Sequence, residues 1–196
     1  MDIKLSPIDE VNIDLLKKWQ NDVNVKYPLM GFRFPIQKKT AKLWQDKVNK
    51  ENPKLIKRWL ENIRKDNGLT RVVYGIKIGN VAIGLASLND INYINRSALL
   101  GIFIAENDKR NKGIGTKATI LILDFAFNAI GLKRVGLEVL KNNKNAIRMY
   151  KKIGFVKEGI KRKAFFRNGS FLDVEIMSIL KSEFKINKKS IANRLV

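Results

Sequence analysis

The sequence predicts one domain of the α+β (mixed α/β) class, in which helices flank a mostly antiparallel, twisted sheet. Two observations lead to this prediction. Apolar residues recur at helical spacing before residue 70 and at strand spacing after it, and an apolar helix follows the glycine-containing turn at 108–117. The length of 196 residues fits a single domain with its own core, which we place at 1–182. A basic C-terminal tail follows at 183–196.

Helical patterns dominate the first third of the chain. Residues 1–5 predict a short strand, and Ser6-Pro7 then predicts a helix start, because Ser is a favoured N-cap and Pro is favoured at the first helical position. We expect this helix to end near Gln20 and a second helical region to cover 41–66. The segment 21–40 between them is irregular and contains aromatic residues, which is typical of a functional loop.

From residue 71 the pattern changes to strands. Runs of apolar and β-branched residues bounded by turn signals predict a hairpin around Gly79-Asn80, strands at 98–105 and 135–140, and a hairpin around Asn168-Gly169. Two helices are expected between these strands. One runs from about Gly113 to Ile130 and closes at Gly131, and a shorter one ends at Gly154.

Composition excludes several functions. The chain has no Cys and no His, so disulfides, thiolate or imidazole metal sites and histidine acid–base catalysis are excluded, and we expect no metal. A net charge of +21 favours polyanionic partners, unless a genome-wide bias toward Lys, Asn and Ile is its cause. The N-terminus lacks a signal-peptide core, and no apolar run approaches the roughly 20 residues that span a bilayer. We expect a cytoplasmic protein without a membrane partner.

The basic turn DKRNKGIGTK opens directly onto a helix N-terminus. Gly113 and Gly115 keep side chains away from the unpaired N–H groups there, and these groups carry partial positive charge. Lys109, Arg110, Lys112 and Lys117 add full charges. The turn therefore predicts a phosphate site, and a glycine-eased entry into a core helix is the alternative.

Two phosphate-binding motifs compete for this turn. A P-loop needs a spacing that GIGTKAT lacks. Gly113-x-Gly115-x-x-Ala118 fits the dinucleotide-binding pattern, with Glu138 about 20 residues further on. Against that pattern, the polar run ENDKRNK separates the strand from the first glycine, and too little chain follows for a doubly wound sheet.

Arg110-x-x-Gly113-x-Gly115 after a strand resembles the acetyl-CoA motif of the GNAT superfamily of N-acetyltransferases. A second block, NNKNAIRMYKKIGF at 142–155, is similar to that superfamily's Asn-x-x-Ala-x-x-x-Tyr-x-x-x-Gly-Phe signature. The C-terminal EGIKRKAFFRNGSFLDVEIMSIL further resembles the branch that contains ribosomal-protein N-terminal and spermidine acetyltransferases. The resemblance covers residues 70–180 well.

The resemblance implies a sheet split between the strands 98–105 and 135–140, with acetyl-CoA as cosubstrate. It implies that loop amides hold the pyrophosphate, that strand main chain holds the pantetheine arm and supplies an oxyanion donor, and that Tyr150 protonates the sulfur. The implied coenzyme-binding residues are Phe103, Ile104, Arg110, Asn111, Lys112, Gly113, Ile114, Gly115, Thr116 and Asn143. Taken without the family, the helical stripe favours Tyr150 as an ordinary core residue, and Asn143 is equally a helix cap.

Two positions depart from the family pattern. Asn111 stands where another glycine is common, and Asn still reaches left-handed backbone angles. Leu99 stands where some relatives have a glutamate, which leaves the general base open. Glu138 is our candidate catalytic base, because it alternates with apolar strand residues, and a surface ion pair with Lys is its other role. Asp90, Glu106 or a water chain are further alternatives.

These features predict an enzyme that moves an acetyl group from acetyl-CoA to a primary amine, of a small molecule such as an amino sugar or polyamine. A ribosomal-type protein N-terminus is the alternative acceptor, and a basic nucleic-acid-binding module the alternative class. The basic surface disfavours a polyamine unless the pocket is locally acidic. No stacking-aromatic motif is evident, so nucleic acid is not expected as substrate. A homodimer stays open, and the acceptor-pocket candidates are Tyr27, Phe32, Arg33 and Phe34.

Overall fold

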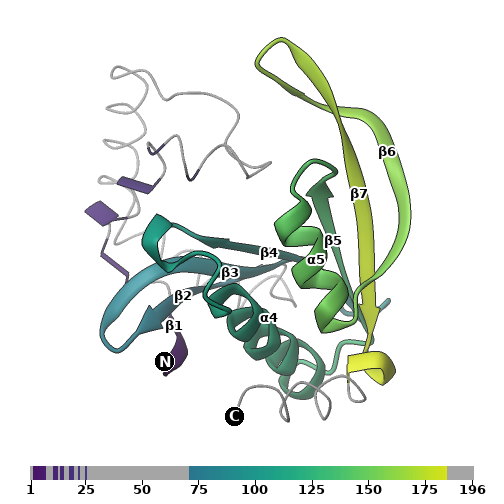
Figure 1. Ribbon diagram of the computed structural model, residues 1–196. Helices are drawn as coiled ribbons and strands as arrows, with labels where there is room; N and C mark the ends of the chain where they lie inside the picture. Colours follow the sequence, from purple (N-terminus) through teal and green to yellow (C-terminus); the bar gives the residue numbers. More distant parts are fainter. Residues whose placement is uncertain are drawn as a thin grey trace, which may run out of the picture.

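The computed structural model describes residues 2–7, 11–12, 14–15, 18–19, 22, 25 and 71–184 (Figure 1). Among these residues, seven strands form one sheet in the order β1-β2-β3-β4-β5-β7-β6. The strands are β1 Ile3–Pro7, β2 Val72–Ile78, β3 Val81–Asn92, β4 Ser97–Ile104, β5 Arg134–Leu140, β6 Val156–Arg167 and β7 Ser170–Leu180. All neighbours pair antiparallel except β4 and β5, which are parallel. The predicted α+β class is confirmed.

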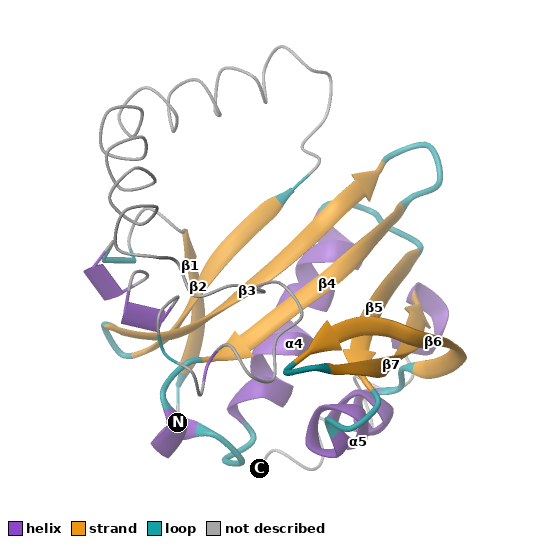
Figure 2. Ribbon diagram, turned by 90° about the horizontal axis from the view of Figure 1, so that it is seen from above, coloured by secondary structure: helices purple, strands orange, loops and turns teal. Residues whose placement is uncertain are grey.

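Two helices cover one face of the sheet (Figures 1 and 2). Helix α4, Ile114–Asp124, follows the short 3-10 turn η2, Asn107–Lys109, and continues into the π-helical turn η3, Phe125–Ala129. Helix α5, Lys144–Ile153, lies beside it and ends at Gly154. Both helices bury their apolar residues against the sheet in one core, and Gly131 ends the α4–η3 segment with a φ of +81°. In the described part of the chain, no helix has the length and apolar character needed to cross a membrane.

A few residues of the N-terminal segment pack against part of the opposite face of the sheet. Trp19 is buried and meets the Phe103 ring edge-on, with 6.0 Å between ring centroids. Val11, Val25, Ala82 and Ala105 complete this smaller apolar cluster. Because Phe103 belongs to β4, Trp19 packs directly beside the strand that bounds the predicted split.

The predicted helix start at Ser6-Pro7 is wrong. Both residues belong to β1, where Ser6 pairs with Gly75 and Pro7 with Tyr74 of β2. Proline is tolerated there because β1 is an edge strand and Pro7 is its last residue, so the missing N–H interrupts no central ladder. The predicted helical region 41–66 and the aromatic loop residues 27–34 lie outside the described residues.

The predicted turns and caps follow local backbone rules. Asn168 and Gly169 both have positive φ, +47° and +77°, as a two-residue type I′ hairpin requires. At the C-terminal end of β7, Phe184 is buried against Phe127, with ring centroids 5.3 Å apart. The described chain therefore stays packed through Phe184, and the domain division at residue 182 remains a prediction.

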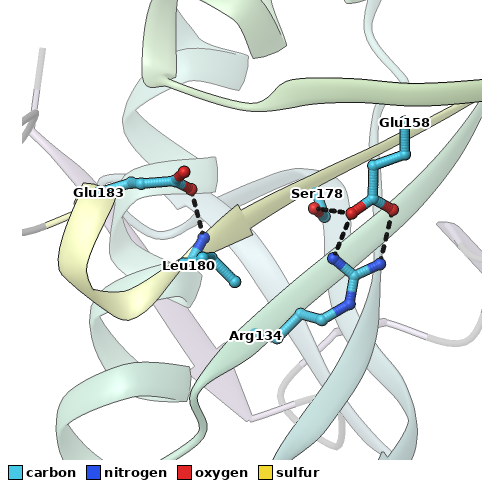
Figure 3. A network of polar contacts seen from close by, with 5 residues as sticks. All are labelled: Arg134, Glu158, Ser178, Leu180 and Glu183. Atoms are coloured by element: carbon cyan, nitrogen blue, oxygen red, sulfur yellow. Dashed lines mark hydrogen bonds and ion pairs between the residues drawn. The ribbon is translucent and has the colours of Figure 1, made fainter.

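A polar network joins β5, β6 and β7 at the end of the sheet where β5 begins (Figure 3). Arg134 donates to both Glu158 oxygens at 2.7 Å, and the Ser178 hydroxyl donates to the same carboxylate at 2.6 Å. The Arg134 guanidinium holds the pKa of Glu158 below its ordinary value. Two-pronged contact of this kind fixes geometry as well as charge, so it holds β5 in register with the hairpin.

Replacing Glu158 by Gln should make unfolding less sensitive to acid. Because the pKa of Glu158 is lowered on folding, its stabilisation is present above the unfolded-state pKa of 4.5 and is lost as the pH falls through the lower folded-state value. The pair is half-exposed, so we expect a loss of less than about 1 kcal/mol at neutral pH. Urea unfolding of both proteins between about pH 6 and about pH 3 measures this, and equal pH dependence would contradict it.

Candidate active site

The hydrogen-bond ladder between β4 and β5 is short. Only Ser97, Ala98 and Leu99 pair with β5, opposite Arg134–Gly136. Further along, β4 continues beside β3 and β5 continues beside β7, so the two strands diverge (Figure 1). We call the space between 101–104 of β4 and 137–140 of β5 the opening. The predicted split of the sheet is confirmed.

The opening is lined by main-chain groups of alternate β4 residues. The Ala105 N–H donates to the Ile83 carbonyl at 2.8 Å, which places the odd-numbered residues of β4 in the ladder with β3. The even-numbered residues Ile102 and Ile104 therefore direct their N–H and C=O groups toward the opening. A ligand that lies along β4 would find donors and acceptors there in strand-like spacing.

Phe103 and Ile104, the two strand residues predicted to bind the pantetheine arm, direct their main-chain groups to opposite sides of β4. The Phe103 carbonyl faces β3, since it lies only 2.2 Å from where a Cβ on Gly84 would stand. Ile104 faces the opening, but its carbonyl accepts a hydrogen bond from Arg110 Nε at 2.9 Å. The Ile104 N–H is thus the main-chain group of this pair that points into the opening. Coenzyme binding by both residues stays a prediction.

Arg110 fastens the glycine turn to the end of β4. Besides the bond to Ile104, its Nη2 donates to the Ala105 carbonyl at 3.3 Å. The next residue, Asn111, has a φ of +60°, the left-handed conformation that a glycine would adopt there. The turn is therefore held in a defined shape. The Arg110 guanidinium, which we predicted to add positive charge at the phosphate site, points toward the end of β4.

The N-terminus of α4 leaves its first N–H groups available. Gly113 is the N-cap, with a φ of +75° and no side-chain cap, and the first helical bond runs from the Lys117 N–H to the Gly113 carbonyl at 3.1 Å. The N–H groups of 114–116 therefore have no helical acceptor. A Cβ on Gly113 would meet nothing within 4 Å, so this side of the turn is open. Free donors, partial positive charge and open space fit a phosphate group.

Helix α5 brings the second predicted motif to the opening. Asn143 caps the helix, and its Oδ1 accepts from the Ala146 N–H at 3.2 Å. Tyr150 is 7% exposed and meets the Phe155 ring edge-on, with centroids 5.5 Å apart. Burial raises the pKa of the Tyr150 hydroxyl well above its ordinary value, so it stays protonated at neutral pH. The cap and core roles are observed, and the coenzyme and proton-donor roles stay predictions.

Glu138 lies on the other side of the sheet from Tyr150. Its neighbours Leu137 and Val139 belong to the core beneath the helices, so Glu138 faces away from them, where it accepts from Lys161 Nζ. Glu106, an alternative base, accepts from Trp19 Nε1 at 3.1 Å. Both carboxylates thus have structural partners, and the catalytic role of Glu138 stays a prediction.

A polar pair on β3 was not predicted. Asn89 Nδ2 donates to Ser87 Oγ at 3.0 Å and to the Leu99 carbonyl at 3.4 Å. The absent side chain of Gly101 makes room for Ser87, whose Oγ lies 2.6 Å from where a Cβ would stand. The alternation of Ser87 and Asn89 with apolar residues in VAIGLASLN was the signal available for this pair. Both residues lie beside the place where β4 and β5 diverge.

Comparison with known proteins points to one family. Residues 4–156 match the model described as acetyltransferase (GNAT) domain. Spermidine N(1)-acetyltransferase of Vibrio cholerae is 39% identical over 102 residues, which cover 52% of this chain and 58% of that protein. The putative ribosomal N-acetyltransferase YdaF of Bacillus subtilis is 29% identical over 143 residues, covering 70% of this chain and 78% of that protein. The chain thus spans less than two thirds of the first of these relatives.

A solved structure extends the likeness over nearly the whole chain. The crystal structure of spermidine N-acetyltransferase from Vibrio cholerae in complex with CoA and spermine has a TM-score of 0.74 and 27% sequence identity. The match covers 93% of this chain and 98% of that one.

Gly113→Ala should reduce the free energy of acetyl-CoA binding by more than it reduces the free energy of unfolding. The new methyl group would stand in the open space at the α4 N-terminus, and the left-handed backbone would cost about 1 kcal/mol. Gly131→Ala is the matched control, because Gly131 also has positive φ and a Cβ there also meets nothing within 4 Å. Urea unfolding and calorimetric titration with acetyl-CoA give both quantities. Equal acetyl-CoA affinity of the two variants would count against the phosphate site.

Proposed function

Since the chain belongs to the GNAT acetyltransferase family, we propose that it transfers the acetyl group of acetyl-CoA to a primary amine of a polyamine such as spermidine. The observation that carries the reaction type is the opening between β4 and β5 beside the uncapped N-terminus of α4. The acceptor class rests on the relatives named spermidine acetyltransferases. Among small amines, these relatives favour a polyamine over an amino sugar.

The residues at the opening suit the proposed coenzyme. The N–H groups of 114–116 would hold the diphosphate, and the Ile104 N–H and Asn143 would contact the pantetheine arm. The coenzyme, when bound, supplies a thioester whose carbonyl carbon an amine can attack. The Ile104 N–H points into the opening, where it can donate to an oxyanion as charge develops on that carbonyl oxygen.

Proton transfer divides between the two faces of the sheet. Tyr150 keeps its proton at neutral pH and can give it to a departing thiolate on the helix side. Glu138 lies on the other side, where a carboxylate can accept a proton from the amine or hold a second ammonium group of the polyamine. The Lys161 ammonium forms an ion pair with the Glu138 carboxylate. An ammonium group of a bound polyamine would therefore compete with Lys161 for it.

A ribosomal-protein N-terminus is the second candidate acceptor. The relative named a putative ribosomal N-acetyltransferase supports it, because that match covers 78% of the relative's own length. The net charge of +21 is also better suited to a partner held on RNA than to a free polycation. The two acceptors differ in size and charge, so one assay separates them.

Acetyl-CoA should raise the melting temperature, and NAD should not. A ligand at about 100 times its dissociation constant adds about 2.7 kcal/mol to the free energy of unfolding, which differential scanning fluorimetry detects. Release of free CoA thiol with spermidine, with an amino sugar and with a ribosomal N-terminal peptide then identifies the acceptor. No shift with acetyl-CoA would reject acetyl transfer, whereas a shift together with release of CoA thiol only when the peptide is the acceptor would reject the polyamine.

Tyr150→Phe should lower kcat at least about tenfold while acetyl-CoA affinity stays nearly unchanged, because the ring is kept and the proton is lost. Tyr74→Phe is the matched control. Burial also raises the pKa of Tyr74, but that residue lies on β2, away from the opening. Steady-state kinetics and coenzyme titration measure both effects. Unchanged turnover in Tyr150→Phe would remove this residue from the proton-donor role.

A further inference from the structure

The β6–β7 hairpin carries an exposed aromatic pair that acetyl transfer does not use. Phe166 and Phe171 lie opposite each other in the register of the two strands, with ring centroids 5.0 Å apart. They are 57% and 62% exposed. Figure 1 shows the hairpin extending beyond α5 and the ends of the other strands. Two large rings held together in water form an exposed apolar patch, the kind of feature from which interaction sites are built.

Basic residues outnumber acids in this part of the chain. The strands β6 and β7 contain five Lys and Arg and three acids, Glu158, Asp173 and Glu175, and residues 141–155 before them add five Lys and Arg and no acid. Glu158 is bound by Arg134, and Glu175 lies 3.8 Å from Lys157. Near the ring pair, the register of β6 against β7 shifts between Lys161 and Phe165, so that the exposed Arg162 and Lys163 lie in a bulge. The hairpin and the segment before it therefore carry a net positive charge, with Arg162 and Lys163 exposed near the aromatic rings.

Asp173 fixes this arrangement from β7. Its Oδ1 accepts from the Lys163 N–H at 3.0 Å, and its Oδ2 accepts from Lys141 Nζ at 3.1 Å. These bonds hold the bulge in shape and tie the turn before α5 to the hairpin. A β-bulge changes the direction in which the side chains of its strand point, and these hydrogen bonds fix that direction.

A hollow adjoins the aromatic pair on the α5 side. Its volume is about 370 Å³, and its walls are Lys141, Asn142, Lys144, Phe171, Leu172 and Asp173. One wall is thus a phenyl ring, another carries ammonium groups, and the Asp173 carboxylate in the wall is neutralised by its ion pair with Lys141. This is the size of a small-ligand pocket, and the combination suits a flat aromatic group joined to an anion.

We propose that this hairpin surface, formed by Lys141, Lys144, Arg162, Lys163, Phe166 and Phe171, binds single-stranded nucleic acid. Bases would stack on the two phenyl rings, which accept any base because every base has a π-face. Phosphates would lie against the ammonium and guanidinium groups. An acidic peptide would satisfy the cations without using the ring faces, and a polyamine would be repelled. The inference goes beyond acetyl transfer and does not depend on it.

The test is fluorescence anisotropy of a labelled oligouridylate of about 12 nucleotides with the full chain. Binding should weaken with salt, with a slope of about −0.7 per phosphate contacted. Phe171→Leu keeps an apolar side chain but loses the ring, so we expect about tenfold weaker binding. Phe171→Tyr keeps the ring and should bind within about twofold of the unmodified protein.

Matched variants separate this surface from general charge. Lys163→Gln should lower the salt slope by about 0.7, whereas Lys133→Gln, an exposed lysine outside the surface, should leave the slope unchanged. Ile94→Ala removes an exposed apolar side chain elsewhere and should leave affinity unchanged.

Four results would overturn the proposal. These are no binding of the oligouridylate, equal binding by Phe171→Leu and Phe171→Tyr, displacement of the oligouridylate by excess acetyl-CoA, and binding to vesicles of anionic lipid but not to the oligouridylate. Displacement would assign the hollow to the coenzyme, and vesicle binding would assign the hairpin to a membrane surface.

Discussion

The structure depends on the early end of the ladder between β4 and β5, because polar main-chain groups left without a neighbour must find other partners. Each strand is held from its outer side, β4 by β3 and β5 by β7. The Arg134–Glu158–Ser178 network fixes the end where the strands still meet. The two halves of the sheet are thus joined directly through three residue pairs, and the opening begins where these pairs end.

The chemistry of the opening comes from elements on both faces of the sheet. On one face, α4 offers free N–H groups and α5 offers a phenol that burial keeps protonated. On the other face lie Glu138 and the Ser87–Asn89 pair. A split sheet lets two reactants approach the same strand from opposite sides. In the reaction that we propose, the proton donor and the proton acceptor would then lie on separate faces, each with its own neighbours.

The features that could be predicted from the sequence are those that local geometry decides. Gly113, Gly131 and Gly154 occupy left-handed caps, and Asn143 caps α5, because these positions follow from short-range backbone rules. The position of Ser6 and Pro7 in a strand depends on pairing with β2, far along the chain. Sequence patterns carry no information about such a partner.

The side-chain contacts that form between different strands could not be predicted from the sequence either. Arg110 was expected to face a phosphate, and its bond to the Ile104 carbonyl depends on how the turn folds back onto β4. The Phe166–Phe171 pair depends on the hairpin register, which brings together residues that the sequence separates by a turn. The motif AFFRNGSF contained both rings, but only their alignment across the strands makes them one surface.

The contact between Arg110 and Ile104 has a consequence for self-association. A half-paired strand inside a sheet is an edge, and edges recruit strands from other molecules. The guanidinium occupies the Ile104 carbonyl at the mouth of that edge. The proposed pantetheine arm is narrow and neutral and has amides of its own, so it can still pair with β4. A polypeptide strand from another molecule would find the Ile104 carbonyl already bonded to Arg110. The residue that shapes the turn thus leaves one acceptor fewer at this edge for a strand of another molecule.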